Sequence, residues 1–135
     1  MIDTWNSAFA TGIELIDKQH KELFRIFRDL QQMVLTECKQ YEYKDFVDII
    51  GEIRDYMTYH FYTEEKLMKE INYPEIDIHK QRHQTFKKEI NKVNYNELKE
   101  NPLKVIDYLR GYIELWIMQH MLLEDIKIGN YLKNR

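Results

Sequence analysis

The sequence predicts an all-α protein: an antiparallel, up-down-up-down four-helix bundle with an N-terminal arm. Glycine and proline are scarce, four and two in 135 residues, so the chain has little material for the turns of a sheet. Its apolar residues recur mostly at intervals of three or four, which is the period of an amphipathic helix. Helix boundary signals divide this pattern into four segments, and short connections between them favour antiparallel neighbours.

The first two helices are expected over residues 17–38 and 43–70. Asn72-Tyr73-Pro74 ends the second one, because the residue before a proline is driven out of the helical conformation. Residues 1–15 are expected to form an arm that lies over the bundle through Trp5 and Phe9. The apolar stripes are Leu23, Phe24, Phe27, Leu30 and Val34 in the first helix, and Phe46, Ile49, Ile50, Ile53, Met57, Leu67 and Met68 in the second.

The third and fourth helices are expected over residues 74–93 and 102–132. The polar stretch between them, residues 94–101, is expected to be a loop. Asn101-Pro102 predicts the start of the fourth helix, because asparagine caps helices and proline fits their first turn. The apolar residues of these helices are Ile76, Phe86, Ile90 and Val93 in the third, and Val105, Ile106, Leu109, Ile113, Trp116, Ile117 and Leu123 in the fourth.

Composition indicates one domain, residues 1–135, and argues against several kinds of partner. The net charge of −3 gives no reason to expect a nucleic acid or an anionic membrane, which are bound by clustered positive charge. No apolar run approaches the ~20 residues that span a bilayer, and the N-terminus does not resemble a signal peptide. The single cysteine, Cys38, fits a reducing compartment. We expect a soluble cytoplasmic protein, either a monomer or a homo-oligomer.

All five histidines fall into spacings that could bind metal. His20 stands alone, His60 precedes Glu64 by four residues, His79 precedes His83 by four, and His120 precedes Asp125 by five. A four-residue step along a helix turns only about 40° and rises about 6 Å, so each four-residue pair shares one helix face. Five imidazoles and two carboxylates are too many for one tetrahedral ion and suit two ions of higher coordination number.

The order of these clusters along the chain also predicts that they meet. They lie near the start of the first helix, the end of the second, the start of the third and the end of the fourth. In a bundle whose helices alternate in direction, those four places are at the same end. Any one spacing has an ordinary explanation, such as a core histidine or a surface helix pair. Together they predict a dinuclear metal site, for which iron is the leading candidate.

The last cluster does not fit a regular helix. A five-residue step turns about 140° beyond a full turn, so His120 and Asp125 would point in different directions. We therefore predict a π-type widening near residues 121–125, a distortion that is frequent at functional sites.

The chain resembles the hemerythrin family over essentially its whole length. The residues that carry the resemblance are Trp5, Asp17-Lys-Gln-His20, His60-Phe-Tyr-Thr-Glu64-Glu65, His79-x-x-x-His83 and Trp116-x-x-x-His120-x-x-x-x-Asp125. The resemblance implies that His79, His83 and His120 hold one iron, and that His20 and His60 hold a second iron with an open position. Glu64 and Asp125 would bridge the pair, together with an oxo or hydroxo group. Dioxygen would bind reversibly at the open position.

Apolar neighbours of these ligands give a reason for reversibility. Similarity to the family places Leu23, Phe61, Trp116, Ile117 and Met121 around the dioxygen pocket. A dry pocket without acidic groups slows the protonation that would release reduced oxygen. Met121 departs from the family, in which an aliphatic residue such as isoleucine is more usual, and its thioether could alter access or be oxidised.

Two other functions remain open at this point. A diiron enzyme would reduce peroxide, nitric oxide or dioxygen, but the Glu-x-x-His motifs of ferritin-like enzymes do not occur in this chain. A histidine-rich set with two carboxylates favours binding over catalysis, while slow peroxidase or nitric oxide chemistry is compatible with it. The other candidate is an iron-handling or sensing module. A mononuclear zinc site is the weakest option, because three ligands would go unused.

Outside the ligand set, Asp17 is expected to cap a helix and Glu65 to face solvent.

Overall fold

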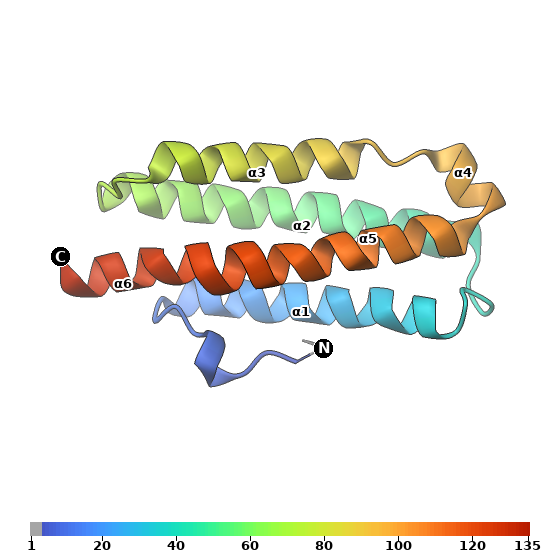
Figure 1. Ribbon diagram of the computed structural model, residues 1–135, viewed down its shortest axis with the longest axis horizontal. Coiled ribbons are helices and arrows are strands. Elements are labelled where there is room, and N and C mark those ends of the chain that lie inside the picture. Colours follow the sequence, from blue (N-terminus) through green and yellow to red (C-terminus); the bar gives the residue numbers. More distant parts are fainter. Residues whose placement is uncertain (1–3) are drawn as a thin grey trace.

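The computed structural model describes residues 4–135, which form helices and connecting turns without any strand. The elements are η1 (Ser7–Phe9), α1 (Glu14–Leu35), α2 (Tyr43–Glu70), α3 (Ile76–Asn91), α4 (Tyr95–Glu100), α5 (Pro102–Trp116), η2 (Ile117–Asp125) and α6 (Ile126–Asn134). Figure 1 shows α1, α2, α3 and the continuous segment α5–η2–α6 lying side by side, with successive connections at alternate ends. Helix α1 packs against α2 and α5, and α2 packs against α3.

Helix α1 begins and ends three residues earlier than expected. It ends at Leu35 because Glu37 and Cys38 adopt positive φ angles of 54° and 59°, which a right-handed helix cannot contain. The amide of Cys38 donates to the carbonyl of Met33 at 2.8 Å, and this bond closes the last turn as in a Schellman motif. Cys38 is therefore buried in the turn after the helix instead of belonging to it.

The expected loop over residues 94–101 is wrong, because most of it forms the short helix α4. The side chain of Asn94 accepts hydrogen bonds from the amides of Asn96 and Glu97, both at 3.0 Å, and so caps the helix. Leu98 on this helix is fully buried in the core, which gives the short element its tertiary support. Helix α5 then begins at Pro102 as expected, although the side chain of Asn101 forms no cap.

The core of the bundle is apolar along the faces that the helices share. Side chains with no exposed surface include Ile26, Phe27, Leu30, Ile53, Ile106 and Ile113. Burying each such side chain contributes roughly 1.5–3 kcal/mol. Leu123 is an error in the expected stripe, since 57% of its surface is exposed on the distorted segment η2. Among the helices described, none is long and apolar enough to cross a membrane.

The segment before α1 lies beside that helix, as Figure 1 shows, and it also contacts α6 near the C-terminus. The ring of Phe9 stacks on Phe24 at 5.7 Å. Asp17 was expected to cap a helix, but it lies inside α1 and accepts hydrogen bonds from the amide and hydroxyl of Thr11, at 2.7 and 2.8 Å. The Thr11 carbonyl lies so close to Gly129 that a Cβ there would meet it at 1.8 Å. The expected arm also includes residues 1–3, which lie outside the described residues.

Candidate metal centre

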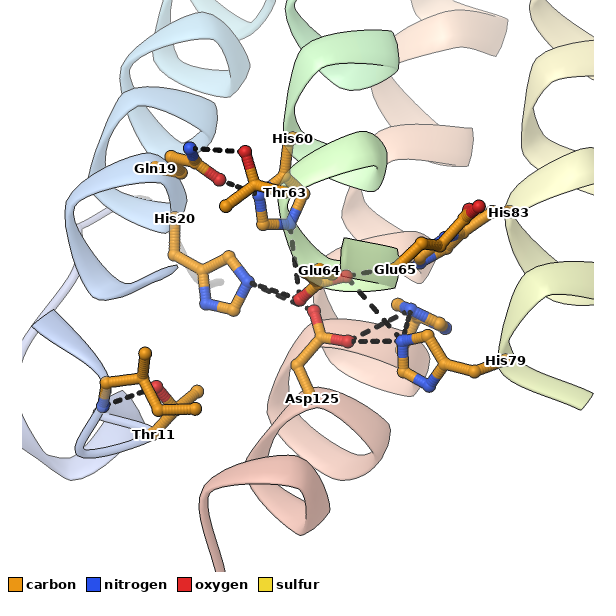
Figure 2. Close-up of polar contacts among 12 residues, drawn as sticks. Thr11, Gln19, His20, His60, Thr63, Glu64, Glu65, His79, His83 and Asp125 are labelled. Carbon is orange, nitrogen blue, oxygen red and sulfur yellow. Dashed lines mark hydrogen bonds and ion pairs between the residues drawn. The ribbon is translucent and has the colours of Figure 1, made fainter. Parts of the chain in front are cut away.

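Seven histidine and carboxylate side chains converge inside the bundle from four different helical segments. They are His20 from α1, His60 and Glu64 from α2, His79 and His83 from α3, and His120 and Asp125 from η2. None is more than 3% exposed, and the two carboxylates have no exposed surface. Figure 2 shows Glu64 and Asp125 in the middle, with His20 and His60 on one side and His79 and His83 on the other.

These side chains form two groups that share both carboxylates. One group contains Glu64, His79, His83, His120 and Asp125; the other contains His20, His60, Glu64 and Asp125. Within each group, one donor atom per residue lies within 4.8 Å of all the others. The structure therefore brings together all seven residues that the sequence singled out, in two groups that could each hold a metal ion and that have both carboxylates in common.

Asp125 contacts imidazoles of both groups. Its Oδ1 lies 2.9 Å from Nε2 of His79 and 3.1 Å from Nε2 of His120, and its Oδ2 lies 3.0 Å from Nε2 of His20. Glu64 does the same at longer range: Oε1 lies 3.1 Å from Nε2 of His83, and Oε2 lies 3.4 Å from Nε2 of His60. Each carboxylate thus offers one oxygen to each group.

A π-helical segment places Asp125 beside His120. Residues Ile117–Asp125 form a π-helix, whose i→i+5 hydrogen bonding brings residues five apart onto the same face. The predicted widening is confirmed, and it begins four residues earlier than expected. An α-helix continued through this segment would turn the Asp125 carboxylate away from the histidines.

Two ligand candidates are held from behind by hydrogen bonds. Nδ1 of His83 lies 2.8 Å from Oε2 of Glu65, and Nδ1 of His60 lies 2.6 Å from Oε1 of Gln19. A carboxylate and an amide oxygen can only accept, so both Nδ1 atoms carry a proton. Burial lowers the pKa of His60 to about 4, so this ring is neutral and its Nε2 presents a lone pair to the site. Glu65 was expected to face solvent, which is wrong: it is half-buried and orients a candidate ligand.

The unsatisfied atoms of the site test whether a metal fits. Nε2 of His60, Nε2 of His83, both oxygens of Glu64 and Oδ1 of Asp125 are buried without a hydrogen-bond partner. Where the Nε2 lone pair of neutral His60 faces Oε2 of Glu64 at 3.4 Å, acceptor meets acceptor in a buried place, which is costly unless a cation lies between them. The donor set, imidazoles with shared carboxylates, suits iron and similar transition metals. The residues present therefore fit a pair of metal ions.

Charges inside the site shift the pKa values of its histidines in opposite directions. Burial opposes the charged forms of His20 and His79, yet hydrogen bonds to Asp125 and Glu64 raise the pKa of each to about 9. Burial dominates at His60 and lowers its pKa to about 4, so this ring is neutral at pH 7. Burial alone would raise the pKa of the two carboxyls, but the surrounding histidines hold both well below their usual values. Without a metal, the site therefore stores protons on part of its imidazoles.

The side chains around the cluster are large and apolar. Phe61 stacks on His83 with ring centres 3.9 Å apart, and Trp116 stacks on His120 at 4.0 Å. Leu23, Phe61, Ile117 and Met121 are buried in the core, while Trp116 is half-buried. The sequence-predicted pocket residues thus belong to the core of the bundle, and two of them lie directly against candidate ligands.

Gln19 contacts a candidate ligand, and the sequence did not single it out. It is 4% exposed, and its amide contacts both His60 and Thr63. The available signal was its position: a glutamine directly before a candidate ligand, on a helix face expected to be buried.

A helical protein with a buried cluster of histidines and shared carboxylates is a cation-binding protein of the non-haem type. Residues 11–132 match the family model described as "Hemerythrin HHE cation binding domain". The chain belongs to the hemerythrin family.

Named relatives agree with this assignment. The chain is similar to a bacteriohemerythrin of Clostridium acetobutylicum, with 31% identity over 90% of this chain and 94% of that protein. It is also similar to bacteriohemerythrins of Pseudomonas paraeruginosa (30% identity, 90% of this chain, 75% of the relative) and Campylobacter jejuni (30%, 90% and 89%).

Proposed function

We propose that this protein holds two iron ions and binds dioxygen reversibly. His79, His83 and His120 would hold one ion and His20 and His60 the other, with Glu64 and Asp125 common to both in an oxo- or hydroxo-bridged pair. The observation that carries this proposal is the sharing of Glu64 and Asp125 by two donor groups of unequal size. The group with two histidines offers fewer donors, which leaves room for an external ligand.

The chain's own residues favour binding over turnover. A pair of irons, when bound, supplies the electrons that dioxygen binding requires. Leu23, Phe61, Ile117 and Met121, the proposed pocket residues, are fully buried and would keep water away from bound oxygen, and Trp116 stacks on the His120 ring. The three carboxyls that contact the candidate ligands, Glu64, Glu65 and Asp125, all have pKa values below their usual range, so none carries a proton to deliver to bound oxygen at neutral pH. Slow protonation is what allows oxygen to leave unchanged.

The visible spectrum during cycling between argon and air tests this function. The protein is loaded with ferrous iron under argon, mixed with air-saturated buffer, and then degassed. A reversible carrier returns to its starting spectrum over several cycles. A diiron enzyme or an iron-handling module would instead end in the diferric state or lose its iron after the first exposure, and either result would refute the proposal.

The finer architecture follows the same proposal. We infer that residues 1–135 are one hemerythrin-like domain, an antiparallel up-down-up-down bundle whose N-terminal residues form an arm against α1. Phe9 on Phe24 and Thr11 on Asp17 support the placement of the arm. The cytoplasmic location and the oligomeric state, monomer or homo-oligomer, stay predictions.

A further inference from the structure

One histidine in each donor group donates a hydrogen bond from its far ring nitrogen, and the two acceptors differ in charge. His83, in the larger group, donates from Nδ1 to the carboxylate of Glu65 at 2.8 Å. His60, in the smaller group, donates from Nδ1 to the neutral amide of Gln19 at 2.6 Å. Both acceptors bind the ring nitrogen that points away from the site, Nδ1. We propose that Glu65 and Gln19 are positioning residues that add to the inequality of two metal positions already different in their number of histidines, with the His83 position binding its ion more tightly; this inference rests on the proposed two-metal site.

The physical basis is the basicity of the imidazole. A carboxylate that accepts the Nδ1 proton adds negative charge to the ring, so Nε2 becomes a stronger donor to a cation. A neutral amide orients the ring without adding charge. Charge-assisted hydrogen bonds are roughly twice as strong as neutral ones. The carboxylate-backed position therefore favours the more highly charged ion, and the amide-backed position binds its ion more weakly.

The amide of Gln19 is itself fixed by a neighbour. The Thr63 hydroxyl donates its only hydrogen to the carbonyl of Tyr59 at 3.1 Å, so toward Gln19 it can only accept. The Gln19 NH₂ group donates to this hydroxyl at 3.2 Å, which turns its oxygen toward His60. The phenol of Tyr56 also donates to the Gln19 backbone carbonyl at 3.1 Å. Thr63 thus determines which nitrogen of His60 carries the proton.

Reciprocal substitutions test the inequality directly. Metal-free wild type, Glu65→Gln and Gln19→Glu are titrated anaerobically with Co²⁺, and the two binding steps are resolved. Proton NMR of the Co²⁺ protein identifies the Nδ1–H signals of His60 and His83 through their loss in D₂O. Glu65→Gln should weaken the His83 position about 10-fold, the low end for such partners, and leave the other position within about 3-fold. Gln19→Glu should tighten the His60 position and leave the His83 position unchanged.

Thr63 offers a matched pair for the amide lock. Thr63→Val keeps the shape but cannot accept from Gln19, so the His60 Nδ1–H signal should broaden and that position should weaken. Thr63→Ser keeps the acceptor and should behave as wild type. Both can be checked for folding by circular dichroism before titration.

The outcomes separate this inference from the proposed function. A Glu65→Gln protein in which both steps weaken equally, or neither does, overturns the inference while two ions still bind. If Thr63→Val and Thr63→Ser give the same His60 Nδ1–H signal and the same affinity at the His60 position, Thr63 does not fix the amide of Gln19. Wild-type protein that binds fewer than two Co²⁺ ions refutes the dinuclear site itself, and the inference falls with it.

Discussion

Removal of the metal ions should lower thermal stability far more than any single surface change. A ligand that binds only the folded state stabilises it by about 2.7 kcal/mol when its free concentration is 100 times its Kd. Two occupied positions give about 5.4 kcal/mol on the same basis. For 135 residues the unfolding entropy near the melting point is about 0.28 kcal/mol per kelvin. Metal-free protein should therefore melt about 20 °C lower than the iron-loaded form.

The assay is scanning calorimetry of iron-loaded and chelator-treated protein under argon, with iron measured in both samples. Asp125→Asn provides the control, because Asp125 contacts histidines of both groups and the amide keeps its shape. This variant should not respond to the chelator, and it should melt no higher than metal-free wild type because it also loses the buried pairs of Asp125 with the histidines. Wild-type protein that demonstrably loses two irons yet melts within a few degrees of its starting value would refute the reasoning.

Three further outcomes are expected from the site and its surroundings. His83→Ala should lower the iron content from about two to one or less per chain, and full retention measured by elemental analysis would remove it from the ligand set. Because the pKa values of His20 and His79 are raised to about 9 in metal-free protein, these two imidazoles should contribute about two protons to the release on metal uptake at pH 7.5, and this contribution should fall toward zero as the pH rises above 9. Calorimetry in buffers of different ionisation enthalpy measures this release, and uptake without protons at pH 7.5 would contradict it. Gly129→Ala should cost about 1–3 kcal/mol of stability, since its Cβ meets a backbone carbonyl at 1.8 Å; Gly111→Ala, with nothing within 4 Å, is the control and should melt no lower than wild type.

The sequence predicts the donor set well because helical periodicity controls it. His60 and Glu64 share a face through spacing alone, and so do His79 and His83. The five-residue step from His120 to Asp125 conflicts with an α-helix, and that conflict itself indicates the π-helical segment. In both cases, local geometry contains the information.

What the sequence does not predict depends on contacts between helices. Glu65 looks like a surface residue next to Glu64, and only the packing of α3 against α2 brings the far nitrogen of His83 to it. Gln19 depends in the same way on Thr63, which lies 44 residues away. The short helix α4 was missed for a different reason. Asn94 followed by Glu97 is a local signal for the start of a helix, but the polar composition of this stretch led us to expect a loop.

The division of the donors along the chain has a consequence for how the protein is assembled. His20, His60 and Glu64 come from the first half of the chain, and His79, His83, His120 and Asp125 come from the second. Each histidine group nevertheless includes the carboxylate of the opposite half. A polypeptide cut in the turn between α2 and α3 would yield two fragments, neither with a full coordination sphere. Bound metal would therefore hold the half of the chain that contains α1 and α2 against the half that contains α3 to α6. Metal uptake would then indicate that the two halves have packed together.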